Sequence, residues 1–158
     1  MSNTSTQLSQ QSTVDQVDVR GPRFAAWITT AVLLAVLVVS AFSVPAAAIL
    51  LAVQGVVFAI GAVRGPRRHP YGLIFATFAA PRLSPVTERE PVPPLQFAQL
   101  VGLIFALVGV AGFALGAPLL GVVATAFALA AAFLNAAFGI CLGCQIYPLV
   151  AHLRHARS

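Results

Sequence analysis

The residues with the clearest chemical potential are two cysteines, Cys141 and Cys144, in a Cys-Leu-Gly-Cys sequence. This spacing lets both sulfur atoms meet across one helical turn, and a helix N-terminus or a nearby cation can then stabilise an attacking thiolate. The motif therefore predicts a redox-active dithiol. The alternative is that both cysteines serve as small apolar residues in a closely packed membrane helix.

Two histidines after the cysteines, His152 and His155, raise the question of a zinc site with two thiolate and two imidazole ligands. Such zinc sites usually place about three to five residues between the histidines. Only two residues, Leu153 and Arg154, separate them in this sequence. We therefore expect no metal at this site, and no other motif points to a bound cofactor.

Three amides lie in or beside apolar stretches: Asn135, Gln54 and Gln99. Buried amides in membrane proteins usually form hydrogen bonds between helices, which is the role expected here. Asn135 and Gln54 could instead line a passive pore for a small neutral or sulfur species. On one continuous helix Asn135 would lie about 120° from Cys141 and opposite Cys144, so we do not expect it to act with both thiols.

Several functions lack the residues that would carry them. The long apolar runs contain no Asp, Glu, Lys, Arg or His, which proton-coupled transporters usually need within the membrane. No phosphate-binding loop, serine-nucleophile motif or pair of carboxylates supports a kinase or a hydrolase. The arginines flank apolar runs and form no clustered basic face, so nucleic acid is not an expected partner.

The elements that position these groups are four long apolar runs in a chain of 158 residues, with 59% hydrophobic and 8% charged residues. A typical globular chain has about 25% charged residues, so lipid must cover this one. Each run approaches the ~20 residues that span the ~30 Å hydrocarbon core of a bilayer. The sequence predicts an all-α membrane protein with one four-helix domain over residues 20–153, its helices covering 24–42, 46–63, 95–115 and 119–142.

Two short turns join these runs in pairs. Pro45 and Pro118 mark the turns and have the same separation along the chain as Phe24 and Phe97, which open the first and third runs. This correspondence predicts a four-transmembrane-helix bundle built from two parallel-repeat helical hairpins. Residues 72–80 between the hairpins are apolar but too few to cross the membrane, so we expect a short interfacial or re-entrant segment there.

The arginines set the expected orientation. All nine basic residues are arginines, and they lie before the first run, in the middle loop or after the fourth run. The positive-inside rule places that side in the cytoplasm. Arginine without lysine, with abundant alanine, is typical of a high-GC bacterial genome, so we expect a multi-pass bacterial plasma-membrane protein. The polar tail 1–19, predicted to be disordered, and the tail 154–158 would both be cytoplasmic.

The length of the fourth run places the two thiols at the cytoplasmic interface. At ~1.5 Å per residue from Leu119, the ~30 Å core is used up near Phe138. Cys141 and Cys144 would then be within reach of a soluble partner, near the C-terminus of the fourth helix. A helix C-terminus disfavours a thiolate, so arginines or histidines of the tail or the middle loop would have to compensate.

Residues 138–144 (Phe-Gly-Ile-Cys-Leu-Gly-Cys), followed by Tyr147, resemble the closing signature of a bacterial, actinobacterial-type membrane family called domain of unknown function 4395. Residues 69–71 (His-Pro-Tyr) and 94–99 resemble its middle-loop motifs, although Leu-Gln replaces the arginine of its usual Pro-Pro-Arg-Phe-Ala. The resemblance covers about residues 20–153 and implies that the Cys-x-x-Cys is a family feature. The family's activity is uncharacterised, but its association with thioredoxin-like and rhodanese proteins implies thiol or sulfur chemistry.

These observations favour a membrane protein that handles thiol–disulfide or sulfur chemistry through a cytoplasm-facing pair, Cys141 and Cys144. The expected partner is a soluble thioredoxin-like or rhodanese-like protein that docks on the basic middle loop, and whether the chain is an enzyme stays open. One alternative is a non-catalytic structural or accessory subunit of a membrane complex, a homo-oligomer included. The other is the passive pore lined by Asn135 and Gln54.

Overall fold

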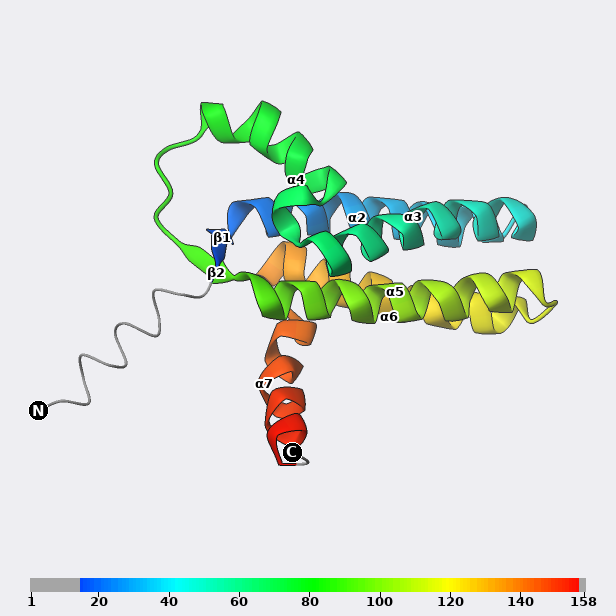
Figure 1. Ribbon diagram of the computed structural model, residues 1–158. Helices are drawn as coiled ribbons and strands as arrows, with labels where there is room; N and C mark the ends of the chain where they lie inside the picture. Colours follow the sequence, from blue (N-terminus) through cyan, green and yellow to red (C-terminus); the bar gives the residue numbers. More distant parts are fainter. Residues whose placement is uncertain (1–14, 157–158) are drawn as a thin grey trace, which may run out of the picture.

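The computed structural model describes residues 15–156, and its main feature is a bundle of four long helices that lie lengthwise beside one another (Figure 1). All four are long and apolar enough to cross a membrane. They are α2 (Arg20–Ser40), α3 (Val44–Arg64), α5 (Val92–Ala114) and α6 (Pro118–Phe138). The predicted all-α membrane bundle is confirmed, and the four apolar runs of the sequence are its long helices.

Large apolar side chains cover the outside of this bundle. In each candidate span only 22–33% of the residues are buried. Phe42 and Ile49 point outward with 87% and 67% of their surface exposed, whereas Leu33 and Leu51 are fully buried. Such a continuous apolar surface is unfavourable in water, whereas the hydrocarbon of a bilayer solvates it well.

The long helices form two hairpins, α2 with α3 and α5 with α6. Ser43 caps α3 after the first turn, its Oγ accepting a hydrogen bond of 3.3 Å from the backbone N–H of Ala46. The second turn contains Gly116 and Ala117. Because α3 packs along α5 and α2 along α6, each hairpin covers the other. Both predicted hairpins are confirmed, whereas their origin in one repeated unit stays a prediction.

The end of the bundle at which α2 and α5 begin is called the loop end here. It carries a short helical segment between the hairpins, which projects from the bundle (Figure 1). Phe75 in this segment is buried against Phe24, with 5.7 Å between ring centroids, whereas Phe78 is exposed. The run 72–80 is thus helical, and its placement at a bilayer surface stays a prediction. The segment consists of η1 (Pro66–Arg68), α4 (Pro70–Ile74), the π-helical turn η2 (Phe75–Ala79) and η3 (Ala80–Arg82).

A two-stranded antiparallel sheet also lies at the loop end. Strand β1 (Gln16–Asp18) pairs with β2 (Arg89–Pro91), and Val17 stands opposite Glu90. The tail 1–19 was expected to be disordered. Residues 1–14 lie outside the described residues, but the end of that tail is an ordered strand, so this part of the prediction is wrong. The backbone hydrogen bonds to β2 hold it in place, and sequence reasoning could not find a partner so distant along the chain.

The fourth long helix ends earlier than the predicted 119–142. α6 stops at Phe138 because Gly139 adopts a left-handed conformation with a φ of 69°, a common way to end a helix. A new helix, α7 (Leu142–His155), then begins with Cys141 as its N-cap and leaves the bundle at a steep angle (Figure 1). The cysteines therefore lie at a helix N-terminus, and their expected position near a helix C-terminus is wrong. α7 also extends into the expected tail 154–158.

Substitution of Gly112 tests the packing of the second hairpin. A Cβ on Gly112 would lie 2.6 Å from the backbone nitrogen of Gly121, so α5 and α6 would have to separate. We expect Gly112→Ala to lower the free energy of unfolding by about 1–3 kcal/mol, measured by thermal unfolding in detergent. The exposed neighbour Ala111 is the control, and Ala111→Val should change stability by less than about 0.5 kcal/mol. Equal effects of both substitutions would contradict the close approach.

Candidate functional site

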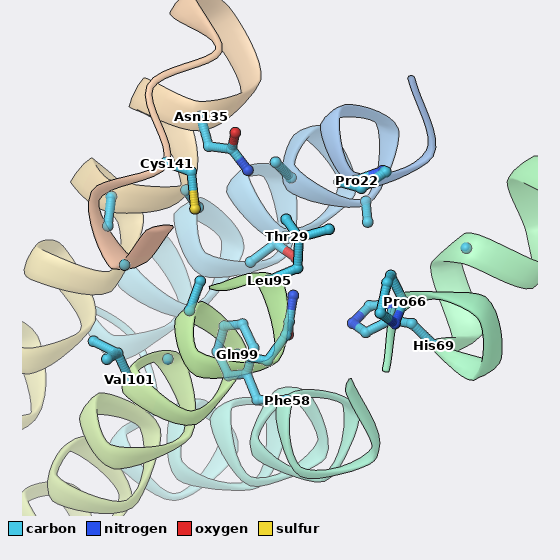
Figure 2. A pocket seen from close by; sticks show the side chains of 18 of the residues that line it. Pro22, Thr29, Phe58, Pro66, His69, Leu95, Gln99, Val101, Asn135 and Cys141 are labelled. Atoms are coloured by element: carbon cyan, nitrogen blue, oxygen red, sulfur yellow. The ribbon is translucent and has the colours of Figure 1, made fainter. Parts of the chain in front are cut away.

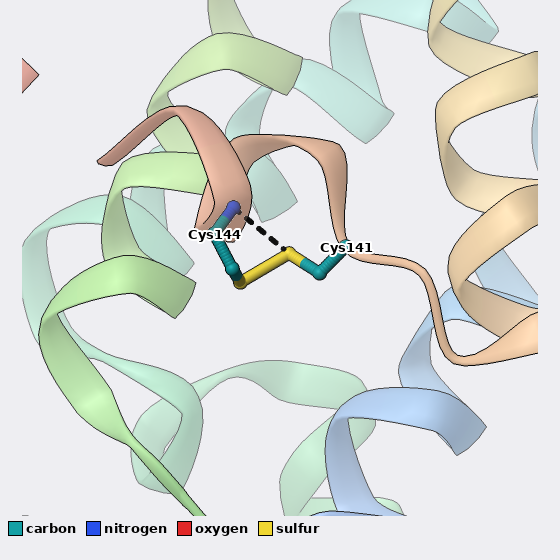
Figure 3. The surroundings of a disulfide bond; sticks show 2 residues. All are labelled: Cys141 and Cys144. Atoms are coloured by element: carbon teal, nitrogen blue, oxygen red, sulfur yellow. Dashed lines mark hydrogen bonds between the residues drawn. A yellow bond between two sulfur atoms is a disulfide. The ribbon is translucent and has the colours of Figure 1, made fainter. Parts of the chain in front are cut away.

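The two cysteines form a disulfide bond at the start of α7, with their Cα atoms 5.2 Å apart (Figure 3). Sγ of Cys141 accepts a hydrogen bond of 3.3 Å from the backbone N–H of Cys144. The sulfur of Cys141 thus occupies the N-cap position, where a helix dipole and free N–H groups stabilise negative charge. In the reduced protein this position suits a thiolate, and no compensating arginine is required.

Gly143, the glycine between the cysteines, holds this helix start against the bundle. A Cβ on Gly143 would lie 2.6 Å from Cα of Ala98 in α5, so only a glycine allows this approach. One turn farther along, Tyr147 meets Phe97 of α5, with 5.9 Å between ring centroids. These contacts place the disulfide directly beside the first turns of α5.

A cavity of about 540 Å³ lies beside the disulfide, among the loop-end halves of the long helices. This inner cavity has a mostly apolar lining that includes Phe58, Leu95, Phe105 and Phe127. Its polar lining includes five uncharged side chains that Figure 2 shows around one space, together with Asp18 of β1 and Arg67 of η1. The five uncharged side chains are Thr29 of α2, His69 before α4, Gln99 of α5, Asn135 of α6 and Cys141 before α7.

His69 is the most unusual of these residues because it is only 2% exposed, and neither ring nitrogen has a hydrogen-bond partner within the described chain. Burial lowers the pKa of His69 to about 4, and the amide of Gln99, which approaches the ring without good hydrogen-bond geometry, opposes this with a smaller effect. The imidazole is therefore neutral at physiological pH. Oε1 of Gln99 is buried and has no partner there either.

A glycine of α3, which has no side chain, leaves the space that His69 and Gln99 occupy. A Cβ on Gly61 would lie 2.6 Å from Cδ2 of His69 and 2.9 Å from Cγ of Gln99. Both side chains therefore rest on the glycine. The structure thus fixes two unpaired polar groups next to each other on the wall of the inner cavity.

The amides singled out in the sequence lie in different surroundings. Asn135 and Cys141 both line the inner cavity, because the chain reversal at Gly139 brings Cys141 back toward the bundle. The expected separation of these two residues on one continuous helix is therefore wrong. Gln54 is absent from the cavity lining, and its Oε1 accepts a hydrogen bond of 2.7 Å from the hydroxyl of Tyr71. Asn135 and Gln54 therefore do not line the same cavity.

A second, smaller space of about 280 Å³ borders both cysteines and is called the outer cleft. Cys141 lines both spaces, whereas Cys144 lines only the outer cleft. Glu90 of β2 also lines it, and burial together with the neighbouring Glu88 raises the pKa of its carboxyl, against the opposing effect of Arg23. The disulfide therefore borders two spaces, and Glu90 lines the outer one.

Among the described residues, no group of three or more His, Cys, Asp or Glu side chains is placed to hold a metal ion. His152, one of the candidate zinc ligands, lies exposed on α7. The side chain of His155 is outside the described part of the chain. The features that define the site are therefore its disulfide, its unpaired polar groups and the two spaces beside them.

Comparison with known protein families decides the family of this chain. The family described as Domain of unknown function (DUF4395) matches residues 17–152. The chain belongs to this family. No curated protein and no solved structure matches it.

In this family member, the three sequence motifs that carried the resemblance meet at the inner cavity. His69 comes from the His-Pro-Tyr motif, Leu95 and Gln99 come from residues 94–99, and Cys141 comes from the Cys-x-x-Cys string. Sequence reasoning did not identify His69, Thr29 or Glu90 as site residues. The first could have been found from its place in a motif, whereas Thr29 and Glu90 carry no local signal.

Substitution of Gly143 tests the docking of α7. We expect Gly143→Val to move the start of α7 away from Ala98, to lower the free energy of unfolding by about 1–3 kcal/mol and to speed alkylation of Cys144 after reduction. Thermal unfolding in detergent and the rate of maleimide labelling measure the two effects. The control is Leu149→Phe, which adds volume at an exposed position of the same helix. Unchanged labelling in Gly143→Val would contradict the docking.

The burial of His69 predicts a pH dependence of stability. Its pKa is about 4 in the folded protein and 6.5 in an unfolded chain, so its contribution is fully present above pH 6.5 and is lost as the pH falls toward 4. Wild type should lose about 3 kcal/mol more than His69→Phe over this range. Unfolding of both proteins in detergent between pH 7 and pH 4 measures the difference. Parallel curves would mean that the ring is accessible to protons in the folded state.

Proposed function

We propose that this protein is a membrane thiol–disulfide exchanger that acts through Cys141 and Cys144 at the cytoplasmic face of a bacterial plasma membrane. One observation carries the proposal: the cysteines form a disulfide at the N-terminus of α7, and Cys144 lines the outer cleft. Cysteines used only for packing would need neither a helix start nor a cleft. The arginines support this orientation, because those in the described chain lie at the loop end or on α7.

In the proposed reaction, a thiolate of a soluble partner with two thiols, such as a thioredoxin-like protein, attacks Sγ of Cys144. A bond forms between the partner and Cys144, the Cys141–Cys144 bond breaks, and Cys141 leaves as a thiolate that the α7 N-terminus stabilises. The second thiolate of the partner then attacks the mixed disulfide and releases Cys144. Two electrons and two protons pass to this chain, and the partner is left with a disulfide.

Glu90 is suited to handle a proton in this exchange. Its carboxyl lines the outer cleft together with Cys144, and its raised pKa makes it a better base than an exposed carboxylate. It can accept the proton of an incoming thiol, since the thiolate is the attacking form. The pairing of β2 with β1 fixes the position of Glu90 at the cleft.

The loop end supplies a surface on which such a partner could dock. Arg64, Arg68 and Arg82 are exposed there and come from the end of α3, from η1 and from η3. Positive charge on this surface attracts a partner with an acidic rim and accelerates its encounter with the protein.

Single-cysteine variants test this proposal. Each variant is first converted to its mixed disulfide with thionitrobenzoate, and a thioredoxin-like protein that keeps only its attacking cysteine is then added. On Cys141→Ser the attacking thiolate should displace thionitrobenzoate from Cys144 and stay bound, because neither protein has a second thiol to resolve the new disulfide. In Cys144→Ser the remaining Cys141 should trap about tenfold less, because Cys141 also faces the inner cavity, whereas Cys144 lines only the outer cleft. The remaining free thiols in the membranes are then alkylated, and trapped complexes are counted on non-reducing gels. The double substitution to serine is the control and should trap nothing.

The redox state of the wild-type pair completes this test. Maleimide mass-tagging of native membranes should find the pair partly oxidised and should label it after reduction without denaturation. If both thiols are always reduced and react only after denaturation, the cysteines are packing residues. Equal trapping by both single variants would instead overturn the assignment of Cys144 as the attacked sulfur.

A further inference from the structure

We propose that the inner cavity binds a membrane quinone, which takes up the electrons that Cys141 and Cys144 receive from their partner. This inference deepens the proposed function and rests on it, because the electrons pass through the same disulfide. It also gives the inner cavity a ligand class that thiol exchange alone does not require.

The position of the cavity fits a lipid-soluble ligand. Its lining on α5 runs from Leu95 to Phe105, which corresponds to about 15 Å of helix, or half of a ~30 Å hydrocarbon core. Phe127 lines the cavity and is also 61% exposed, so one side chain separates the cavity from the lipid that surrounds the bundle. Its ring stacks on that of Phe105, with centroids 6.1 Å apart. A flat lipophilic molecule has a short route in at this wall.

The unpaired polar groups fit the head of a quinone better than a lipid chain. His69 is 2% exposed with both ring nitrogens unpaired, and Oε1 of Gln99 is buried and unpaired, although burial without a partner costs stability. A quinone carries two carbonyl oxygens on opposite edges of a flat ring, and each accepts a hydrogen bond. The neutral ring of His69 and the amide of Gln99 can donate to one oxygen. Thr29 and Asn135, farther around the lining, can donate to the other.

The sulfur of Cys141 completes this arrangement. In Figure 2 it points into the same space as Asn135 and Gln99, with His69 across the cavity. The volume of about 540 Å³ lies within the range of about 300–1,000 Å³ that small-molecule sites occupy. A quinone held by the polar groups would therefore lie beside the sulfur that leaves first in the exchange reaction.

The proposed redox step balances without any further reactant. The two thiols of Cys141 and Cys144 lose two electrons and two protons, and the bond between their sulfur atoms forms. The quinone gains the same two electrons and two protons and becomes the hydroquinone. Its new hydroxyl groups can donate hydrogen bonds, and the unpaired Oε1 of Gln99 is an acceptor for one of them. The disulfide is then ready for the next partner.

The experiment uses the full-length protein, reduced and freed of reductant, in detergent without oxygen. The probe is decylubiquinone, whose ring is fully substituted and therefore resists direct addition of thiols. Loss of quinone absorbance should accompany formation of one disulfide per quinone consumed. Binding is measured separately by equilibrium titration of the Cys141→Ser, Cys144→Ser double variant, which has no thiols to react. This variant should bind the probe without reducing it.

Substitutions locate the reaction in the inner cavity. His69→Leu and Gln99→Leu should each weaken probe binding by about tenfold, the effect expected from a lost hydrogen bond to the ligand. Ala131→Leu adds volume to the lining, replaces no polar side chain and should also weaken binding. The matched control is Tyr71→Phe, which removes a partly buried hydroxyl close to His69 but outside the lining, and which should bind as wild type does.

The outcomes separate this inference from the proposed function. If wild type exchanges thiols with a dithiol but the double variant does not bind decylubiquinone, the quinone site is wrong and the exchange function stands. If the probe binds but the cysteines exchange with no dithiol, the proposed function is wrong. Oxidation of the thiols at an equal rate in wild type and Ala131→Leu would mean that the quinone reacts elsewhere, and this would also overturn the site.

Discussion

The left-handed backbone at Gly139 is the constraint on which the loop end depends, because it stops α6 and turns the chain back toward α5. Residues other than glycine resist this conformation by about 1–2 kcal/mol. The reversal has two effects on the cysteines. It places Cys141 on the wall of the inner cavity, and it starts a new helix whose N-terminus lies at the disulfide. A continuous α6 would have carried both sulfurs along its own surface, near a helix end that repels negative charge.

Close approach of helices at bare backbone is the second theme of the structure. Gly143 lets α7 begin against α5, and Gly61 makes room for His69 and Gln99 on α3. In a bilayer, helices gain little from the hydrophobic effect when they associate, so van der Waals contact and small residues must hold them together. The same rule that stabilises the bundle therefore shapes the site, because each glycine creates a space that a neighbouring segment fills.

Hydropathy and charge, which are local properties of a sequence, were enough to predict the four spans, their pairing and the common side of the arginines. The site required tertiary information. Gly139 resembles any glycine in an apolar run, which membrane helices tolerate, so the end of α6 was not predictable. His69 lies among prolines and arginines and reads as an exposed loop residue, yet packing against Gly61 buries it. Strand β1 depends on a partner in the middle loop.

The short turns of the two hairpins fix how the protein fits its membrane. Helices of 21 to 23 residues are about 32–35 Å long, slightly more than the ~30 Å hydrocarbon core. The turns at Ser43 and Gly116, at the end opposite the loop end, are too short to adjust their length. In a thinner bilayer the whole bundle must therefore tilt, or its loop end must move toward water. Bilayer thickness therefore sets how far the bond between Cys141 and Cys144 lies from the membrane surface, and lipid composition becomes a variable in its chemistry.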